Sequence, residues 1–312
     1  MLDRLSKTVF STLARSGSLK SLASRFGMRR ADSFARRFIA GETIDEALAA
    51  ARVVEQAGLH TTLDLLGESV SSAAAAGEAT LAYLDVMRKI TDAGVERNVS
   101  LKLTQLGLDI DRATCVDNLR RILDEAAARD FFVRVDMENS PYTERTIEIF
   151  ETLWNIGYRN AGIVLQSYLR RSEADVHRMN KLGARVRLVK GAYKEPADAA
   201  FQQKAEVDAQ FVHLMKILLK EGIYPAIATH DEAMIGATTA FAEASGLGKD
   251  KYEFQMLYGI RRDLQTSLAA AGHPFRVYVP FGREWFPYFM RRLGERPANI
   301  GFVIRGITSE KK

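Results

Sequence analysis

The 312-residue sequence contains one cysteine, Cys115, so no intramolecular disulfide bond can form. This scarcity is typical of a reducing compartment, and Cys115 is expected to be a small buried apolar residue. No uninterrupted apolar run approaches the length of about 18 residues that a membrane-spanning helix needs, and no segment has the apolar core of a secretory signal. We therefore expect a cytoplasmic protein.

The short motifs of several enzyme classes are also missing. The five histidines form neither a His-X-His nor a His-Glu-X-X-His pair, and one cysteine cannot form a cluster, so no metal site is expected. No Gly-X-Ser-X-Gly motif supplies a nucleophilic serine, and no Gly-X-Gly-X-X-Gly motif follows an apolar run. The net charge is +5, but acids and bases alternate along most of the chain, which disfavours a nucleic-acid partner.

The first 30 residues differ in composition from the rest of the chain, with seven Lys or Arg, one acidic residue and several serines. Apolar residues between Leu2 and Leu13 recur at helical spacing. The segment is interpreted as a membrane-surface helix or targeting segment, or as a helical arm packed on the main domain. The sequence leaves these interpretations open.

From residue 60 onward, eight short strand-like segments alternate with amphipathic helical stretches. Their ranges are 60–67, 98–106, 131–138, 161–168, 185–193, 224–231, 252–259 and 275–282. This alternation predicts a parallel sheet, and eight repeats predict a closed (βα)8 barrel of the α/β class. An open doubly wound sheet is the alternative. We divide the chain into an N-terminal helical arm at 1–57, a barrel at 58–305 and a C-terminal tail at 306–312.

Buried parallel strands are normally near-continuous runs of Val, Ile and Leu, but these segments carry polar residues, mostly toward their C-terminal ends. The residues are Lys102, Arg134, Asp136, Glu138, Gln166, Arg187, Lys190, Thr229, His230, Asp231, Glu253, Gln255 and Tyr278. Any one of them is equally well explained by a structural ion pair, such as Lys102 with Asp136. Their convergence on one barrel mouth favours an active site. A lyase with Lys102 or Lys190 as its Schiff-base lysine is one alternative.

Arg291 and Arg292 follow the eighth segment on a short helical stretch, with Glu295 one turn later. Adjacent helical positions diverge by about 100°, so the two guanidinium groups can clamp one small anion from two sides. Glu295 can hold either arginine, and Tyr278 supplies a flat wall and a hydroxyl. The stretch is interpreted as a lid helix that binds a small carboxylate, whether for catalysis or for binding alone. A surface helix with ordinary Arg–Glu pairs is the alternative.

Four ordered motifs, RLVKGAY, ATHD, EFQMLYG and YVPFGREWFPYFMRRLGERPAN, resemble those of the FAD-dependent proline dehydrogenase family, in particular its monofunctional bacterial members. The resemblance implies a distorted (βα)8 TIM-like barrel with FAD over the C-terminal ends of the strands. The implied reaction oxidises L-proline to Δ1-pyrroline-5-carboxylate, the first step of proline catabolism. The implied electron acceptor is a membrane quinone, which implies peripheral contact with the inner membrane face.

The resemblance also assigns roles to individual positions. The implied substrate-binding residues are Lys102, Tyr278, Arg291, Arg292 and Glu295, and the implied catalytic residues are Asp136 and Arg187. The implied FAD-binding residues are Met137, Gln166, Arg187, Lys190, Gly191, Ala192, Tyr193, Thr229, His230 and Gln255. Glu68 resembles the family glutamate that pairs with the first lid arginine as a gate. Tyr288 would crowd a 4-hydroxyl group, so proline is the expected substrate rather than trans-4-hydroxyproline.

Overall fold

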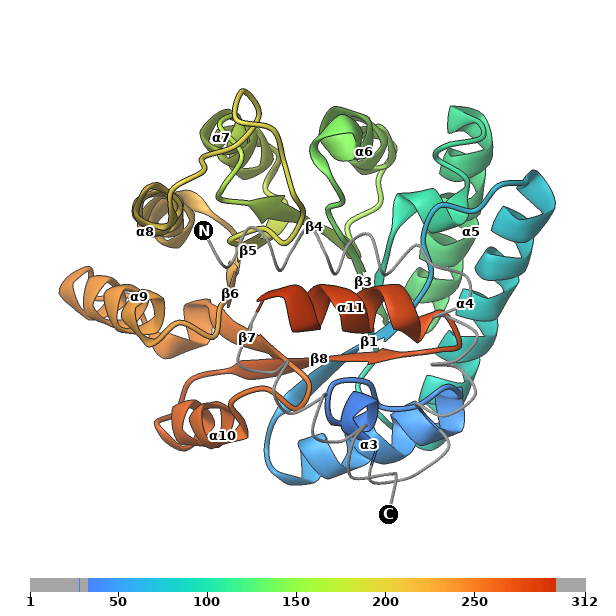
Figure 1. Ribbon diagram of the computed structural model, residues 1–312, viewed down its shortest axis with the longest axis horizontal. Helices are drawn as coiled ribbons and strands as arrows, with labels where there is room; N and C mark the ends of the chain where they lie inside the picture. Colours follow the sequence, from blue (N-terminus) through green and yellow to red (C-terminus); the bar gives the residue numbers. More distant parts are fainter. Residues whose placement is uncertain (1–27, 29–32, 296–312) are drawn as a thin grey trace, which may run out of the picture.

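In the computed structural model, which describes Met28 and residues 33–295, eight parallel strands form a closed barrel in sequential order. The strands are β1 (His60–Leu65), β2 (Asn98–Leu101), β3 (Phe132–Val135), β4 (Ala161–Gln166), β5 (Arg185–Val189), β6 (Ala226–Ala228), β7 (Glu253–Leu257) and β8 (Phe275–Phe281). Helices surround the barrel (Figure 1). The predicted (βα)8 barrel is confirmed, and the open-sheet alternative is wrong.

Within the described ranges, the helices include three short 3-10 turns. The helical elements are η1 (Phe34–Arg37), α3 (Ile44–Gln56), α4 (Ala73–Ala93), η2 (Leu103–Leu106), α5 (Arg112–Ala128), α6 (Ser140–Asn155), α7 (Ser172–Leu182), α8 (Lys204–Glu221), α9 (Glu232–Ala244), η3 (Lys249–Lys251), α10 (Arg262–Ala270) and α11 (Trp285–Glu295). Local chemistry sets several of their N-termini. Ser72 and Asp111, for example, accept hydrogen bonds from backbone N–H groups in the first turns of α4 and α5.

Some sequence predictions fall outside the described residues. Most of the first 30 residues and the whole predicted tail at 306–312 do so. The division into arm, barrel and tail therefore stays a prediction. Within the described ranges, no helix combines the length and the apolar character that a bilayer crossing requires.

Every strand is shorter than its predicted segment, and the shortening of β2 positions a site residue. β2 ends at Leu101, and Lys102 then precedes the turn η2, whose Gln105 N–H donates to the Lys102 carbonyl at 3.2 Å. The backbone N–H of Thr104 donates to the carboxylate of Glu138 at 3.1 Å, which stabilises this turn. Lys102 therefore leaves the strand ladder at the barrel mouth. β6 is likewise confined to Ala226–Ala228.

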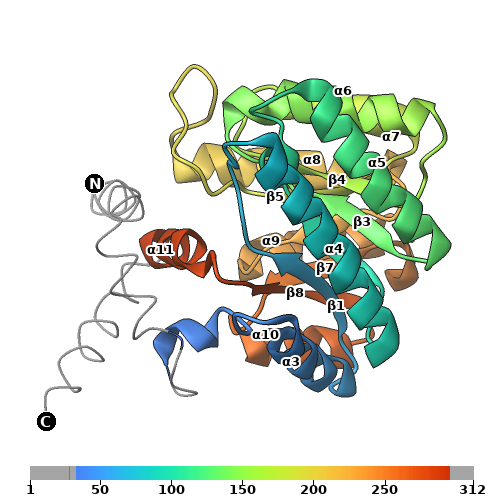
Figure 2. The same ribbon diagram turned by 90° about the vertical axis from the view of Figure 1, so that its right-hand side faces the viewer.

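The barrel is distorted at the junction of β8 and β1. α3 precedes β1 and packs against both β1 and β8. In a regular barrel, the helix that follows β8 occupies this position. The buried residues of α3 are Ile44, Ala47, Leu48 and Ala51. Just before α3, Ala40 N–H donates to the Pro280 carbonyl and Gly282 N–H donates to the Gly41 carbonyl, both at 2.9 Å. α11, which follows β8, instead lies across the mouth (Figures 1 and 2).

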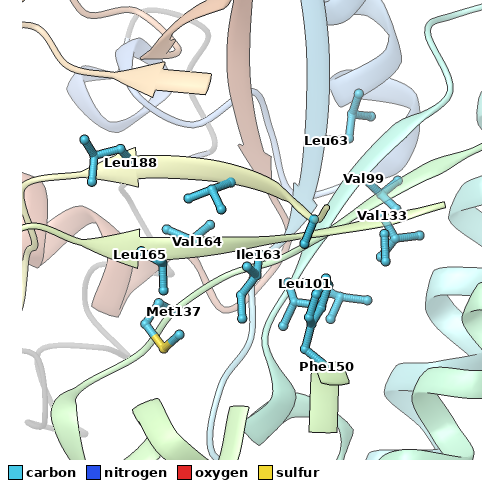
Figure 3. Packing of buried hydrophobic residues seen from close by; sticks show 14 of the residues in the cluster. Leu63, Val99, Leu101, Val133, Met137, Phe150, Ile163, Val164, Leu165 and Leu188 are labelled. Atoms are coloured by element: carbon cyan, nitrogen blue, oxygen red, sulfur yellow. The ribbon is translucent and has the colours of Figure 1, made fainter. Parts of the chain in front are cut away.

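The core consists of the barrel strands and the inner faces of the helices. β4 is buried at all six positions, as expected for a parallel strand covered on both faces. Val164 lies on the opposite face of β4 from Ile163 and Leu165, which face the helix layer near Phe150 (Figure 3). Cys115 is fully buried, and this burial raises the pKa of its thiol to about 12, so the prediction of a buried apolar role is confirmed.

Two polar strand residues lie toward the N-terminal end of the barrel rather than at the mouth. Glu253 is the first residue of β7, and its carboxylate lies 3.1 Å from Nε of Arg276. Nη1 of Arg134 donates to the carbonyl of Arg185, the first residue of β5, at 2.8 Å. The expectation that the polar residues gather at the mouth is wrong for Glu253 and Arg134, because side-chain alternation does not fix the height of a residue in a tilted barrel.

Candidate active site

A cavity of about 520 Å³ lies at the C-terminal ends of the strands, beneath α11. The predicted site residues that line it are Lys102, Asp136, Met137, Gln166, Arg187, Lys190, Gly191, Ala192, Tyr193, Thr229, His230, Gln255, Tyr278, Arg291 and Arg292. Tyr288 and the apolar residues Val164, Val189, Ala228, Met256 and Leu257 complete much of the wall. The structure thus brings together side chains from most strands and the lid helix.

The two other predicted residues lie elsewhere. Glu68 lines a smaller cavity of about 60 Å³ that shares Lys102, Tyr288 and Arg291 with the main cavity. The side chain of Glu295 lies outside the described part of the structure, so its predicted contact with the arginines stays a prediction.

Asp136 connects three elements of the barrel mouth. Its Oδ1 accepts a hydrogen bond from Nη1 of Arg187 at 2.9 Å, and its Oδ2 accepts one from the Tyr278 hydroxyl at 2.8 Å. The Arg187 guanidinium also lies 5.4 Å from the centre of the Tyr278 ring, in cation–π range. Because all three side chains are buried, each holds the others in one orientation.

Lys102 lies between two buried carboxylates. Its Nζ is 3.4 Å from Oδ2 of Asp64 and 3.7 Å from Oδ2 of Asp136. Burial alone would lower the pKa of Lys102, but the two carboxylates outweigh it and hold the pKa above its ordinary value. The two carboxylates therefore favour the charged form of Lys102. This charge state argues against a Schiff-base lysine, which requires a neutral amine.

Lys190, the other candidate Schiff-base lysine, is also paired. Its Nζ lies 2.5 Å from Oδ1 of Asp208 on α8 and 2.7 Å from Oδ2 of Asp231. Asp231 also accepts a hydrogen bond from the backbone N–H of Ala233 in the first turn of α9. These contacts join the end of β5 to α8 and α9.

Asp64 is a site residue that the sequence analysis missed. It lies near the end of β1, is fully buried, and contacts Lys102. Burial raises the pKa of the Asp64 carboxyl, and the neighbouring Asp136 carboxylate adds to that effect, whereas Lys102 opposes it. The signal was present, because Asp64 interrupts the leucines of the segment LDLL and so breaks the pattern of a buried strand.

The two arginines of α11 reach different partners. Nη1 of Arg291 lies 2.7 Å from Oε1 of Glu68, and its guanidinium lies 5.8 Å from the centre of the Tyr193 ring. The Arg292 guanidinium lies 5.2 Å from the centre of the Tyr288 ring. Burial would raise the pKa of Glu68, but the charge of Arg291 holds it below its ordinary value, so this pair is ionic. The lid helix is therefore attached to the mouth by a charge pair beside the cavity.

His230 and Gln166 contribute acceptor atoms to the cavity lining. The backbone N–H of Leu257 donates to Nε2 of His230 at 3.0 Å, so that nitrogen is unprotonated. Oε1 of Gln166 is buried, and no donor in the described residues reaches it. Because its lining combines several cations with apolar residues, the cavity suits a small anion beside a larger ring system.

The chain matches the family model described as proline dehydrogenase over residues 47–305. It is 40% identical over 306 residues to proline dehydrogenase 2 of Bacillus subtilis, covering 98% of this chain and 100% of that protein. It is also 40% identical over 311 residues to proline dehydrogenase of Deinococcus radiodurans, covering 98% of this chain and 99% of that protein.

The structure resembles proline utilization A (PutA) from Bdellovibrio bacteriovorus, inactivated by N-propargylglycine, with a TM-score of 0.77 and 30% identity. The likeness covers 83% of this chain but only 32% of PutA, which is the longer protein. The match to the family model over most of the chain and the identity to full-length relatives lead to one conclusion: this chain belongs to the proline dehydrogenase family.

Proposed function

We propose that the protein oxidises L-proline to Δ1-pyrroline-5-carboxylate, with FAD as its cofactor and a membrane quinone as electron acceptor. The observation that carries this proposal is that Lys102, Arg291 and Arg292 line the same cavity as the residues assigned to FAD. A carboxylate substrate and a flavin ring can therefore meet in one enclosed space.

Two features of the cavity fit a flavin. The buried Oε1 of Gln166, which has no donor among the described residues, would accept a hydrogen bond from a cofactor N–H or hydroxyl group. Gly191 has a φ of 117°, and a Cβ there would lie 2.4 Å from the Tyr168 ring, so the backbone itself forms this part of the wall. When bound, FAD supplies the hydride acceptor.

We propose that two groups of side chains hold the reactants. Those for FAD are Met137, Gln166, Arg187, Lys190, Gly191, Ala192, Tyr193, Thr229, His230 and Gln255, all of which line the cavity. Those for proline are Lys102, Arg291 and Arg292 at the carboxylate and the Tyr278 ring against the pyrrolidine ring. Glu68 would release Arg291 as a gate.

The proposed reaction needs little acid–base catalysis from the side chains of the protein. A hydride leaves C5 of proline and the amine proton leaves its nitrogen as the C=N bond forms, and a neutral amine needs no strong base. The cations instead hold the substrate in register, which lowers the barrier through orientation. Asp136 keeps Arg187 and Tyr278 in place through the contacts of 2.9 Å and 2.8 Å.

The experiment that tests this proposal is a visible spectrum of the purified protein before and after anaerobic addition of L-proline. Flavin bands that bleach on addition support both the cofactor and the substrate. Bands that stay oxidised contradict the substrate. A colourless protein that FAD cannot reconstitute contradicts the cofactor, and proline binding without turnover would then indicate a carboxylate-binding protein.

We also propose a cytoplasmic location with peripheral contact at the inner membrane face. A quinone acceptor resides in a membrane, and a basic segment with apolar residues at helical spacing binds anionic lipid surfaces. The composition of residues 1–30 supports this proposal.

A further inference from the structure

The segment between β5 and α8, residues 190–203, forms one wall of the cavity through Lys190, Gly191, Ala192 and Tyr193. Long connections of this kind owe their conformation to contacts that they make elsewhere. The contact that stands out here involves Glu195, whose side chain is buried, with the residue only 9% exposed. A carboxylate is rarely buried without specific donors.

The donors of Glu195 lie at the start of α6. The backbone N–H of Ser140 donates to Oε1 of Glu195 at 2.8 Å, and the Ser140 hydroxyl donates to Oε2. The N-cap residue of this helix, Asn139, makes no side-chain capping bond. Glu195 therefore supplies the cap from another loop, and its charge lies at the positive end of the helix dipole.

Tyr168 also contacts the segment 190–203, through its side chain and its backbone. Its hydroxyl donates to Oε1 of Glu195 at 3.4 Å, and its ring lies against Gly191. Its backbone N–H donates to the Lys190 carbonyl at 3.0 Å, and its carbonyl accepts from Phe201 N–H at 2.8 Å. Both ends of the segment are thus joined to Tyr168, and Glu195 holds its middle.

Glu195 thereby joins two walls of the cavity. A short connection joins β3 to α6, and it carries the cavity residues Asp136 and Met137. The segment itself carries Tyr193, whose ring lies 5.8 Å from the Arg291 guanidinium of the lid helix. A shift of this segment would move the backbone at Gly191 and the ring below Arg291 together.

We propose that Glu195 is a positioning residue, which through Ser140 fixes the backbone at Gly191 for FAD and the Tyr193 ring for the lid arginine. This inference rests on the proposed function for its ligands, FAD and proline, but the position of the segment can be measured without either.

The test compares Glu195→Ala and Glu195→Gln with the parent protein. Glu195→Ala is expected to weaken FAD binding and raise the KM for proline, each about tenfold, as for the loss of a charged hydrogen bond. It is also expected to speed amide hydrogen exchange across 190–203. Glu195→Gln keeps an acceptor for the Ser140 N–H and should retain most of the parent behaviour. Ser140→Ala, which loses only the hydroxyl bond, should give an intermediate effect.

The matched control is Asp111→Ala. Asp111 caps α5 in the same way, accepting from Thr114 N–H at 2.8 Å and from the Thr114 hydroxyl at 3.1 Å. The Asp111→Ala variant should have a lower unfolding temperature than the parent. Its FAD affinity, its KM for proline and its amide hydrogen exchange across 190–203 should be unchanged. If Glu195→Ala behaves like this control, the positioning role is overturned. If Glu195→Ala does not fold, unchanged FAD affinity and unchanged hydrogen exchange across 190–203 in Ser140→Ala overturn the positioning role.

Failure of the proposed function gives a different pattern. A parent protein that proline does not reduce would contradict the substrate assignment, while FAD affinity and hydrogen exchange would still decide the role of Glu195. Faster exchange across 190–203 in Glu195→Ala, without any change in exchange in Asp111→Ala, is the result expected in that case too.

Discussion

At the residue scale, the barrel mouth is organised by buried carboxylates rather than by its cations. Asp136 holds Arg187 and Tyr278, Asp64 holds Lys102, and both carboxylates keep Lys102 protonated. A cation so held loses little conformational freedom when it binds an anion. The carboxylates thus prepare the site for the ligand that we propose.

Arg291→Ala is expected to raise the KM for L-proline about 10- to 100-fold, because one charged contact to the carboxylate is lost. FAD content should stay at the parent level. Steady-state kinetics and the flavin-to-protein absorbance ratio measure both quantities. The control is Arg283→Ala, an exposed arginine just before the lid helix, which should change neither. Loss of flavin in Arg291→Ala would contradict its assignment to the substrate.

Tyr288→Ser is expected to lower the preference for proline over trans-4-hydroxyproline about tenfold, because the phenol ring that lines the cavity would no longer crowd the hydroxyl group. The ratio of the two kcat/KM values measures this preference. Tyr158→Phe, a change in the connection between α6 and β4, serves as the control. A parent protein with comparable kcat/KM for both substrates would contradict the hypothesis.

At the scale of elements, the segment before α3 packs against the lid helix α11 and holds it in position. Trp285, at the start of α11, is 1% exposed and donates from Nε1 to Oε1 of Glu42 at 3.0 Å. Phe38 packs on Phe289 with ring centres 6.4 Å apart. Since Ala40 also bonds to the end of β8, this segment holds the point where the chain turns into the lid.

Glu42→Ala is expected to raise the KM for proline severalfold, because the buried Trp285 N–H loses its acceptor and the lid helix is less firmly seated. FAD content should not change, because α11 contributes none of the residues assigned to the cofactor. Kinetics and flavin content are again the measurements. The control is Asp45→Ala, an exposed acid in the first turn of α3. Equal KM values in both variants would show that Glu42 does not position the lid.

At the scale of the whole molecule, the two ends of the barrel differ in role. The mouth carries the cavity, whereas the opposite end carries an ion-pair network in which Arg276 contacts Glu253 at 3.1 Å and Glu96 at 2.6 Å. Such a division between function and stability is typical of (βα)8 barrels. His60 extends this network, with Nδ1 2.7 Å from Oε2 of Glu96.

The contact with Glu96 raises the pKa of His60 above 6.5, although burial opposes it. A pKa raised by folding adds stability below about pH 6.5, and this stability is lost as the pH rises through the folded-state pKa. His60→Gln should therefore be less stable than the parent by a few tenths of a kcal/mol at about pH 5.5, because the side chain is half exposed and screened. The difference should vanish near pH 9. Urea unfolding at the two pH values measures it, and a difference that grows with pH would contradict the assignment.

Deletion of residues 1–27 is expected to leave flavin reduction by proline intact and to lower turnover with a membrane-bound quinone. The physical reason is that basic side chains are attracted to an anionic lipid surface. Cosedimentation with anionic vesicles and quinone reduction in them are the measurements, with neutral vesicles as the control. Unchanged sedimentation would contradict the membrane role of this segment.

Much of the site followed from local sequence signals. Lys102, Asp136 and Arg187 break runs of apolar residues that otherwise predict buried strands, and such a break costs free energy unless the residue has a partner or a ligand. The resemblance of the motifs then supplied the roles that we propose for the lid arginines. Glu195 gave no such signal, because it lies in a polar connection whose burial depends on α6.

The sequence by itself determined the eight strand–helix units, the closed parallel barrel and most residues of the mouth, because side-chain periodicity and strand ends are local properties. Only the tertiary structure decided that α3 covers β8 and β1 while α11 crosses the mouth, that Glu253 lies at the opposite end, and that Glu195 caps α6. These features depend on register, barrel tilt and contacts between distant segments, and local periodicity carries no information about them.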